Sequence, residues 1–256
     1  MKDVGESRAR NEEFARRFSR ERVIQSVVTA SAPTIIDVGA HHGQSARYLR
    51  ELFPGSTIHS FEPDPDSFQR LVSLGLADHH CTQAALSDRR GQVTFFRNGI
   101  SHTNSLHRVN LESNDSIKLT EARRTGGNDF SRSLNQPFEV RCSTLDDYCQ
   151  EAEITRVDLL KIDVQGAEAS VLRGAARTLE STSAVVLEAS FYDFYEHRTG
   201  IAELEHCLGP AGLSLFSILE ISQNPMNGRT DWAELLYTQD RREGPGTNRQ
   251  SERDRR

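Results

Sequence analysis

Two glycines and an aspartate stand where a predicted buried strand turns into a helix. The segment DVGAHHG (residues 37–43) follows the apolar run Thr34–Val38 and precedes a helical pattern over Gln44–Leu52. Gly39 allows a tight turn and Gly43 allows close approach of a ligand, while the start of a helix favours a carboxylate or phosphate. The spacing is not the G-x-G-x-x-G dinucleotide fingerprint, so this loop alone is weak evidence for a cofactor site.

An acidic residue, Glu62, closes the next predicted strand, Thr57–Phe61. A carboxylate at this place can accept hydrogen bonds from both hydroxyls of a ribose, as in Rossmann-type nucleotide sites. The alternative role is to cap the following helix, for which Asp66 is better placed. The loop and the acid together predict a cofactor that contains ribose.

S-adenosylmethionine suits this pattern because it has a ribose, an adenine and a free carboxylate but no pyrophosphate. Asp37, at the end of its strand, can lie near the ammonium group of this cofactor. Asp88 follows the third predicted strand, together with Ala84 and Ser87, where the adenine edge would lie. The expected cofactor-binding residues are therefore Asp37, Gly39, Gly43, Glu62 and Asp88.

The segment DLLKIDVQGAE (residues 158–168) is the most distinctive of the chain. Lys161 and Asp163 are two residues apart, so on a strand they point to the same face. They stand near the carboxyl end of a central strand, where open sheets bind ligands. Glu188, in the run AVVLEA (residues 184–189), lies on the same rim. We expect Lys161, Asp163 and Glu188 to be the catalytic group, and a purely structural ion pair is the alternative.

Methyl transfer to a hydroxyl requires alignment of the acceptor and removal of its proton by a base or a metal. The candidate bases are Asp163, Glu188, His41, His42, His102 and His107. Asp163, Glu188 and Asp193 could instead hold Mg²⁺, which prefers oxygen ligands. The sequence leaves the metal question open.

Short apolar runs alternate with helical patterns over residues 33–240, which predicts a mostly parallel sheet with helices on both faces. Among these elements are a strand over Cys81–Leu86 and a helix over Ala167–Leu179. Residues 1–32 are charged and predict a helix packed on this domain, with its arginines on a solvated face. Residues 97–137 have weak periodicity and predict a lid or substrate loop. Residues 241–256 predict a disordered tail.

The composition excludes several classes of protein. There are 31 Lys and Arg residues against 37 Asp and Glu, for a net charge of −6, which argues against binding to nucleic acid or an anionic membrane. No apolar stretch reaches the length of a membrane span, and the first residues lack a signal-peptide core. The four cysteines form no C-x-x-C pair and predict reduced thiols in a cytoplasmic protein.

The motifs IIDVGAHHG, FEPDPDSF, ALSDRRG, NSL, STLDDYC, LLKIDVQGAEASVLRGA and VVLEASF occur in this order. Together they resemble FkbM-type methyltransferases over about residues 34–238. The resemblance implies dependence on S-adenosylmethionine and the Rossmann-like class I methyltransferase fold, an α/β fold with a seven-stranded sheet whose last strand is antiparallel. It also implies cofactor contacts at Asp37, Gly39, Gly43 and Glu62, and the family usually has Asn where this chain has His41.

The sequence therefore predicts an S-adenosylmethionine-dependent methyltransferase acting on a hydroxyl of a small molecule or sugar. A non-catalytic nucleotide- or cofactor-binding module is one alternative, although it would not need the charged rim. A nicotinamide-dependent oxidoreductase is another, but the glycine spacing disfavours it. A nucleic-acid methyltransferase fits poorly with the acidic net charge.

Overall fold

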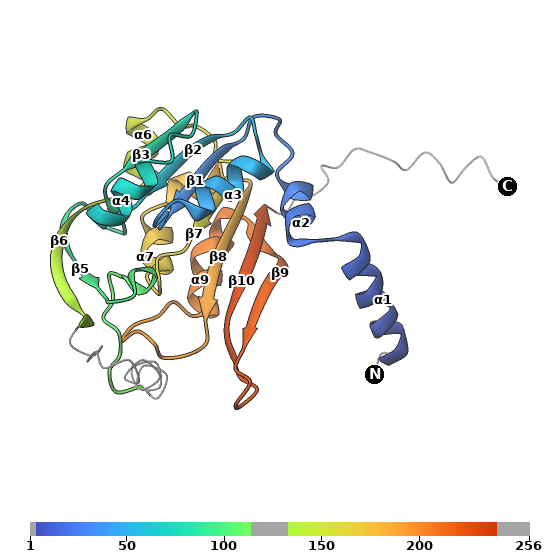
Figure 1. Ribbon diagram of the computed structural model, residues 1–256. Coiled ribbons are helices and arrows are strands. Elements are labelled where there is room, and N and C mark those ends of the chain that lie inside the picture. The colour runs from blue at the N-terminus through green and yellow to red at the C-terminus, as the bar shows by residue number, and fades with distance from the viewer. Residues whose placement is uncertain (1–3, 114–132, 240–256) are drawn as a thin grey trace.

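A seven-stranded sheet forms the middle layer of the molecule (Figure 1). The computed structural model describes residues 4–113 and 133–239. In spatial order the strands are β3 (His79–Thr82), β2 (Thr57–Phe61), β1 (Thr34–Val38), β7 (Leu159–Ile162), β8 (Ala184–Ser190), β10 (Thr230–Gln239) and β9 (Leu213–Gln223). The last strand, β10, is antiparallel to both of its neighbours, and the remaining pairs are parallel. The predicted fold class is confirmed.

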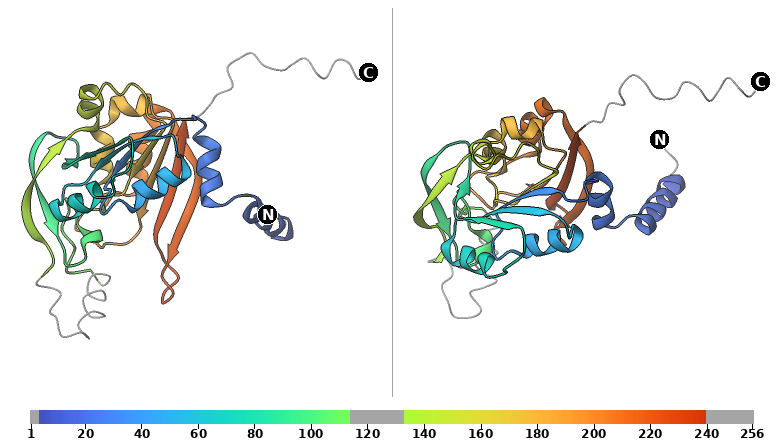
Figure 2. Two further views of the ribbon diagram at one scale, coloured as in Figure 1. Left: turned by 45° about the horizontal axis from the view of Figure 1, so that its top comes forward. Right: turned by 90° about the horizontal axis from the view of Figure 1, so that it is seen from above.

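Helices cover both faces of this sheet (Figure 2). One face carries α2 (Arg20–Val27), α3 (Gln44–Leu52) and α4 (Pro65–Val72). The other carries α6 (Leu145–Glu151), α7 (Glu168–Arg173), α8 (Ala176–Glu180) and α9 (Ile201–Leu208), with the short η3 (Gly209–Ala211) after it. Within the described residues, no helix has the length and apolar character needed to cross a bilayer.

The central strands are apolar apart from the site residues Asp37, Lys161 and Glu188, because the side chains of each strand pack into two cores. Ile36 and Leu160 belong to the cluster on the side of α6–α9, whereas Ile35 and Leu159 belong to the cluster on the side of α2 and α3. Successive residues of a strand point to opposite faces, so a strand that is covered on both sides needs a continuous apolar run. The runs TIIDV and AVVLEA meet this requirement.

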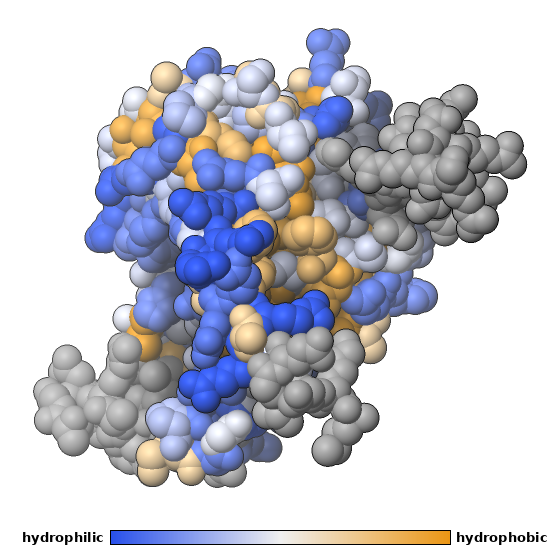
Figure 3. Space-filling view, turned by 90° about the vertical axis from the view of Figure 1, so that its right-hand side faces the viewer, coloured by the Kyte–Doolittle hydropathy of each residue, from blue (hydrophilic) through white to orange (hydrophobic). Residues whose placement is uncertain are grey.

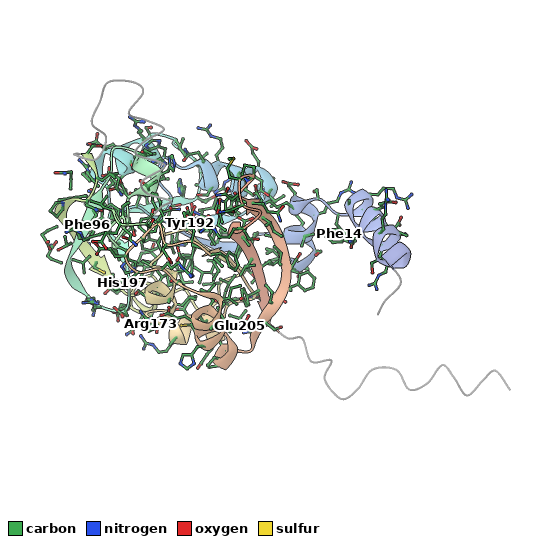
Figure 4. The ribbon with its side chains drawn as sticks, turned by 90° about the horizontal axis from the view of Figure 1, so that it is seen from below. Phe14, Phe96, Arg173, Tyr192, His197 and Glu205 are labelled. Carbon is green, nitrogen blue, oxygen red and sulfur yellow. The ribbon has the colours of Figure 1, made fainter. Side chains whose placement is uncertain are left out.

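The N-terminal segment forms two helices rather than the single packed helix that we expected. In α2, Val23 and Ile24 are buried in the core. In α1 (Val4–Arg17), Phe14 remains half exposed, and the helix projects from the body (Figures 1 and 4). Ser19 separates the two helices because its hydroxyl caps α2 by accepting a hydrogen bond from Arg22 N at 3.3 Å. From this side the surface around the hydrophilic α1 is partly apolar (Figure 3).

A second sheet of three strands was not expected from the sequence. It contains β4 (Ala85–Leu86), β6 (Gln136–Ser143) and β5 (Gly91–Arg97), in that order. The predicted single strand over residues 81–86 is therefore wrong, since β3 and β4 belong to different sheets. β6 was missed because its first residues lie in the polar stretch that we interpreted as a loop.

Two helix boundaries also differ from expectation. The helix expected over residues 167–179 is divided into α7 and α8 at Gly174, where a Cβ would lie 2.0 Å from the carbonyl oxygen of Ser87. The cap of α4 is Asp64 rather than Asp66, because Asp64 Oδ1 accepts hydrogen bonds from the amides of Asp66 and Ser67 at 3.0 Å. Both differences reflect contacts that a local pattern does not encode.

The ends of the expected lid are fixed by buried amide side chains. Asn135 accepts a hydrogen bond from Val109 N at 2.7 Å and donates one to Val109 O at 2.9 Å. The backbone amide of Asn135 donates a hydrogen bond to Asn98 Oδ1 at 2.8 Å. A short helix, η1 (Ser101–Thr103), lies in the first part of the segment. Residues 114–132 of the expected lid and the expected tail over 241–256 are outside the described residues, and both roles stay predictions.

Replacing Asn135 with Ala should lower the free energy of unfolding by about 2–4 kcal/mol, because both polar backbone groups of Val109 lose their partner in a buried place. Urea denaturation measures this value. Asn227→Ala, at an exposed turn where the side chain accepts one bond from Arg229 N, is the matched control and should change it by less than about 1 kcal/mol. Equal effects of the two variants would contradict this account of the loop.

Candidate active site

A cavity of about 490 Å³ opens at the carboxyl ends of β1, β2 and β7. Four of the predicted site residues line it, namely Gly39, Glu62, Lys161 and Asp163. Parallel strands β1, β2 and β7 are direct neighbours, so their carboxyl ends meet at one edge of the sheet. The cavity therefore lies where the sequence predicted it, and its volume is typical of a small-molecule site.

A buried ion pair lies beneath the cavity. Lys161 Nζ is 3.2 Å from Asp37 Oδ1, 3.3 Å from the carbonyl oxygen of Gly39 and 3.7 Å from Asp163 Oδ2. Burial alone would lower the pKa of Lys161, but the charges of Asp37 and Asp163 outweigh it, so the pKa is raised and the amine stays charged. Ser45 donates a hydrogen bond to Asp37 Oδ2 at 2.6 Å. Asp37 is therefore fully buried and does not itself line the cavity.

Glu62 is held on the wall of the cavity in one orientation. It is 5% exposed, and its two carboxylate oxygens accept hydrogen bonds from the backbone amides of His41 and Asp64, each at 2.8 Å. Burial raises the pKa of Glu62 to about 7 despite these bonds. A carboxyl group fixed in this way keeps lone pairs for two further donors, as a ribose would supply.

The two loop glycines are required by packing. At Gly39, with φ +80°, a Cβ would lie 1.9 Å from the carbonyl oxygen of Asp163. At Gly43, with φ +84°, a Cβ would lie 2.3 Å from Leu74 Cδ1, on the side of α4. Gly43 is the N-cap of α3 and is not among the lining residues. Its cofactor role stays a prediction, and the observed reason for glycine there is the left-handed backbone conformation, since Leu74 Cδ1 is the end of a flexible side chain.

A chain of hydrogen bonds that was not predicted from the sequence fixes Asp163. Gln165 Nε2 donates to Asp163 Oδ1 at 2.7 Å, and the hydroxyl of Tyr195 donates to Gln165 Oε1 at 3.0 Å. Gln165 has φ +59° and lines the cavity. It belongs to the segment DVQGAE, so its position next to Asp163 was a usable signal, whereas Tyr195 comes from a distant loop.

Glu188 lies in an adjoining pocket of about 200 Å³ that shares Lys161 and Asp163 with the main cavity. Trp232 lines the same pocket. Burial, with the nearby charges of Asp163 and Glu168, raises the pKa of Glu188 to about 8. The structure thus brings the three predicted catalytic residues together, with Glu188 protonated at neutral pH.

The candidate histidines divide into two groups. His41 and His102 line the main cavity, whereas His42 and His107 do not. His41 Nε2 is 2.8 Å from Ser101 Oγ, and burial together with the neighbouring His42 and His102 lowers the pKa of His41 to about 4. A neutral imidazole in this place can exchange hydrogen bonds with a ligand.

Asp88 lies away from the cavity. It pairs with Arg89 at 3.2 Å and with Arg173 at 3.5 Å, and it is not among the lining residues. Its predicted neighbour Ala84 does line the cavity, together with Phe61 and Leu86. An adenine would therefore meet an apolar wall, and the role of Asp88 in cofactor binding stays a prediction.

The three acids considered for Mg²⁺ do not form a metal site. Asp193 is paired with Arg198 at 3.2 Å, and Asp163 is occupied by Gln165 and Lys161. In the part of the chain that the structure describes, no group of three or more His, Cys, Asp or Glu side chains could hold a metal ion. Asp163, Glu188 and Asp193 therefore do not fit a Mg²⁺ ion.

Comparison with known proteins agrees with this geometry. A family model described as the methyltransferase FkbM domain matches residues 37–210. The chain belongs to this family. It is accordingly an S-adenosylmethionine-dependent methyltransferase. The family match therefore disfavours the alternative of a nicotinamide-dependent oxidoreductase.

Three relatives illustrate the range of the family. The chain is 31% identical to 2-O-methyltransferase NoeI of Sinorhizobium fredii over 68% of its own length and 70% of the relative. It is 27% identical to 31-O-demethyl-FK506 methyltransferase FkbM of Streptomyces tacrolimicus, over 55% and 58% of the two chains. It is 24% identical to hexuronic acid methyltransferase AglP of Haloferax volcanii, over 59% and 54%. The match thus spans little more than half of two of these relatives.

The site fits the cofactor of the family. Glu62 offers a fixed carboxylate to a ribose, and Phe61, Ala84 and Leu86 offer an apolar surface to an adenine. His41 has φ +49°, a left-handed conformation that Asn adopts more readily than other residues. This conformation agrees with the Asn that the resemblance implies at this position, and His41 uses its backbone amide to hold Glu62.

Glu188→Gln should change how stability depends on pH. Because the pKa of Glu188 is about 8 in the folded chain and near 4.5 when exposed, the folded state binds more protons between these values. Its contribution to the free energy of unfolding therefore falls as the pH rises through this range. The glutamine variant lacks this loss, so its stability relative to the wild type should increase from about pH 5 to about pH 8.5, by up to about 1.4 kcal/mol per pH unit.

Urea denaturation across this pH range measures the difference, with Glu139→Gln on the exposed face of β6 as the control. The control should follow the wild type at every pH. A Glu188→Gln curve parallel to that of the wild type would contradict the buried, protonated state of Glu188.

Proposed function

We propose that this chain transfers the methyl group of S-adenosylmethionine to a hydroxyl oxygen of a small molecule or sugar. The observation that carries the proposal is a single cavity lined by both Glu62 and Asp163, with an adjoining pocket that contains Glu188. The first acid suits the ribose of the cofactor, and the other two face the space left for an acceptor. The relatives include a 2-O-methyltransferase and a hexuronic acid methyltransferase, which support an oxygen on a sugar-like acceptor.

Asp163 is the proposed base. Its side chain is 41% exposed, so it can reach a ligand, and the Gln165 amide fixes one of its oxygens. The bound cofactor supplies a methyl group that its sulfonium has already activated. The task of the protein is then to hold the acceptor hydroxyl in line and to take its proton at a carboxylate oxygen of Asp163. Lys161 supports this role through position, because its ammonium lies 3.7 Å from the other carboxylate oxygen, Oδ2.

Glu188 is proposed to bind the acceptor. Since its pKa is about 8, it is protonated at neutral pH and can donate a hydrogen bond to an acceptor oxygen. Trp232, in the same pocket, adds a flat apolar surface beside a polar group. These features favour an acceptor with several hydroxyl groups on a compact ring.

A small-molecule acceptor and a cytoplasmic location remain parts of the proposal. All four cysteines are free, including the buried Cys142 and Cys149, which agrees with a reducing compartment.

Glu62→Gln should weaken the binding of S-adenosylmethionine about 10- to 100-fold, because an amide cannot accept hydrogen bonds from two ribose hydroxyls at both of its ends. Isothermal titration calorimetry measures this change. Glu188→Gln is the matched control on the same rim and should bind the cofactor within about 3-fold of the wild type. Equal losses in the two variants, or none at Glu62, would overturn the assignment of the ribose site.

Asp163→Asn should reduce turnover about 10²- to 10⁴-fold, the usual contribution of a general base. The rate of methyl transfer is measured with an acceptor selected from a panel of hydroxylated sugars. Asp193→Asn, in an exposed ion pair, should keep the wild-type rate. An Asp163→Asn enzyme with wild-type turnover would rule out this carboxylate as the base, and cofactor binding without turnover on any acceptor would favour a non-catalytic binding module.

A further inference from the structure

An arginine from the N-terminal helix pair is clamped against the last strand of the sheet. Arg20, the first residue of α2, donates from Nε and Nη2 to the two carboxylate oxygens of Glu234 on β10, both at 2.6 Å. The guanidinium also lies over the ring of Tyr48, 4.8 Å from its centroid. Arg20 and Glu234 are both outside residues 37–210, which the family model matches. This clamp is therefore a feature of the segments that flank the family domain.

The clamp forms one end of the cofactor cavity. Arg20 and Glu234 line it together with Gln44 and Ser45, the first two residues of α3. The same four residues also line an adjoining hollow beneath α2. Figure 1 shows α2 packed at this edge of the body, beside the upper part of β9 and β10. The helix thus places a cation at the end of the cavity formed by α2, α3 and β10.

Glu234 orients the guanidinium of Arg20 without engaging all of its N–H donors. A guanidinium has five N–H donors in a rigid fork, and Glu234 takes one from Nε and one from Nη2. Donors therefore remain on the edge away from Glu234. The side chain of Arg20 is 30% exposed, so a ligand in the cavity can reach it. Bidentate pairing with Glu234 removes most of the conformational freedom that Arg20 would otherwise lose on binding.

The charges around the cavity suit a ligand that carries both an ammonium and a carboxylate. Lys161 is already engaged by Asp37, Asp163 and the carbonyl oxygen of Gly39. Arg20 is the other Lys or Arg side chain among the described residues that line the cavity. A carboxylate is therefore best placed at the Arg20 end, where the start of α3 also favours negative charge, and an ammonium is best placed on the side of the acids that line the cavity.

We propose that Arg20 binds the carboxylate of the methionine portion of S-adenosylmethionine, with Glu234 as the residue that positions it. This inference rests on the proposed function, since it takes the cavity to be the cofactor site. It assigns a binding role to α2, so that cofactor affinity depends on a helix outside the family domain.

Decarboxylated S-adenosylmethionine is the probe that isolates this contact, because it lacks the carboxylate alone. Calorimetric titration of the full chain with both compounds should show that Arg20→Ala weakens S-adenosylmethionine about 10- to 100-fold, the usual effect of losing a charge-assisted hydrogen bond. The same variant should bind the decarboxylated compound within about 3-fold of the wild type. Arg22→Ala, an exposed arginine two residues along the same helix, is the matched control and should change neither affinity.

Each other result overturns the inference in a recognisable way. Equal weakening of both ligands by Arg20→Ala would mean that Arg20 only closes the cavity, and unchanged binding of both would mean that it does not contact the cofactor. Arg20→Gln keeps a polar side chain with hydrogen-bond donors but removes the charge, so it provides the same comparison if the alanine variant does not fold. If the wild type and the Arg22→Ala control bind neither compound, both the proposed function and this inference fail. The absence of binding is then a property of the whole chain and not of Arg20.

Discussion

The ion pair between Asp37 and Lys161 is the interaction on which the site depends. These two residues are direct neighbours in the register of β1 and β7, and Asp37 is fully buried. Removing one partner would leave the other charged in the interior, at a typical cost of about 3–5 kcal/mol. Because the same ammonium also holds the carbonyl oxygen of Gly39 and approaches Asp163, the pair fixes the cofactor loop and the base relative to one another.

This arrangement gives acids of one rim different properties. Glu62 and Glu188 are largely buried, and burial raises their pKa values to about 7 and about 8. Asp163 is instead 41% exposed, accepts a hydrogen bond from Gln165 and lies 3.7 Å from the ammonium of Lys161. One rim can therefore present a hydrogen-bond donor at Glu188 and a proton acceptor at Asp163. This division of roles is what transfer to a neutral hydroxyl needs.

Strand ends were predictable from the sequence, and long-range pairings were not. Glu62, Lys161 and Asp163 were found because the carboxyl ends of adjacent parallel strands meet, which follows from the alternation of strands and helices. Asp88 was placed near the adenine because it follows a strand, but no local pattern predicted its ion pair with Arg173 from α7, and it is not among the lining residues of the cavity. The arginines of the N-terminal segment were interpreted as a solvated face, and no local pattern could join Arg20 to a glutamate on the last strand.

The most direct test of the account is a crystal structure of the chain with S-adenosylhomocysteine, the product form of the cofactor. We expect the ribose hydroxyls within hydrogen-bond distance of the Glu62 carboxylate and the adenine against Phe61 and Leu86. The sulfur should face the pocket shared by Asp163 and Glu188. Adenosine bound elsewhere, or a sulfur turned away from Asp163, would contradict it.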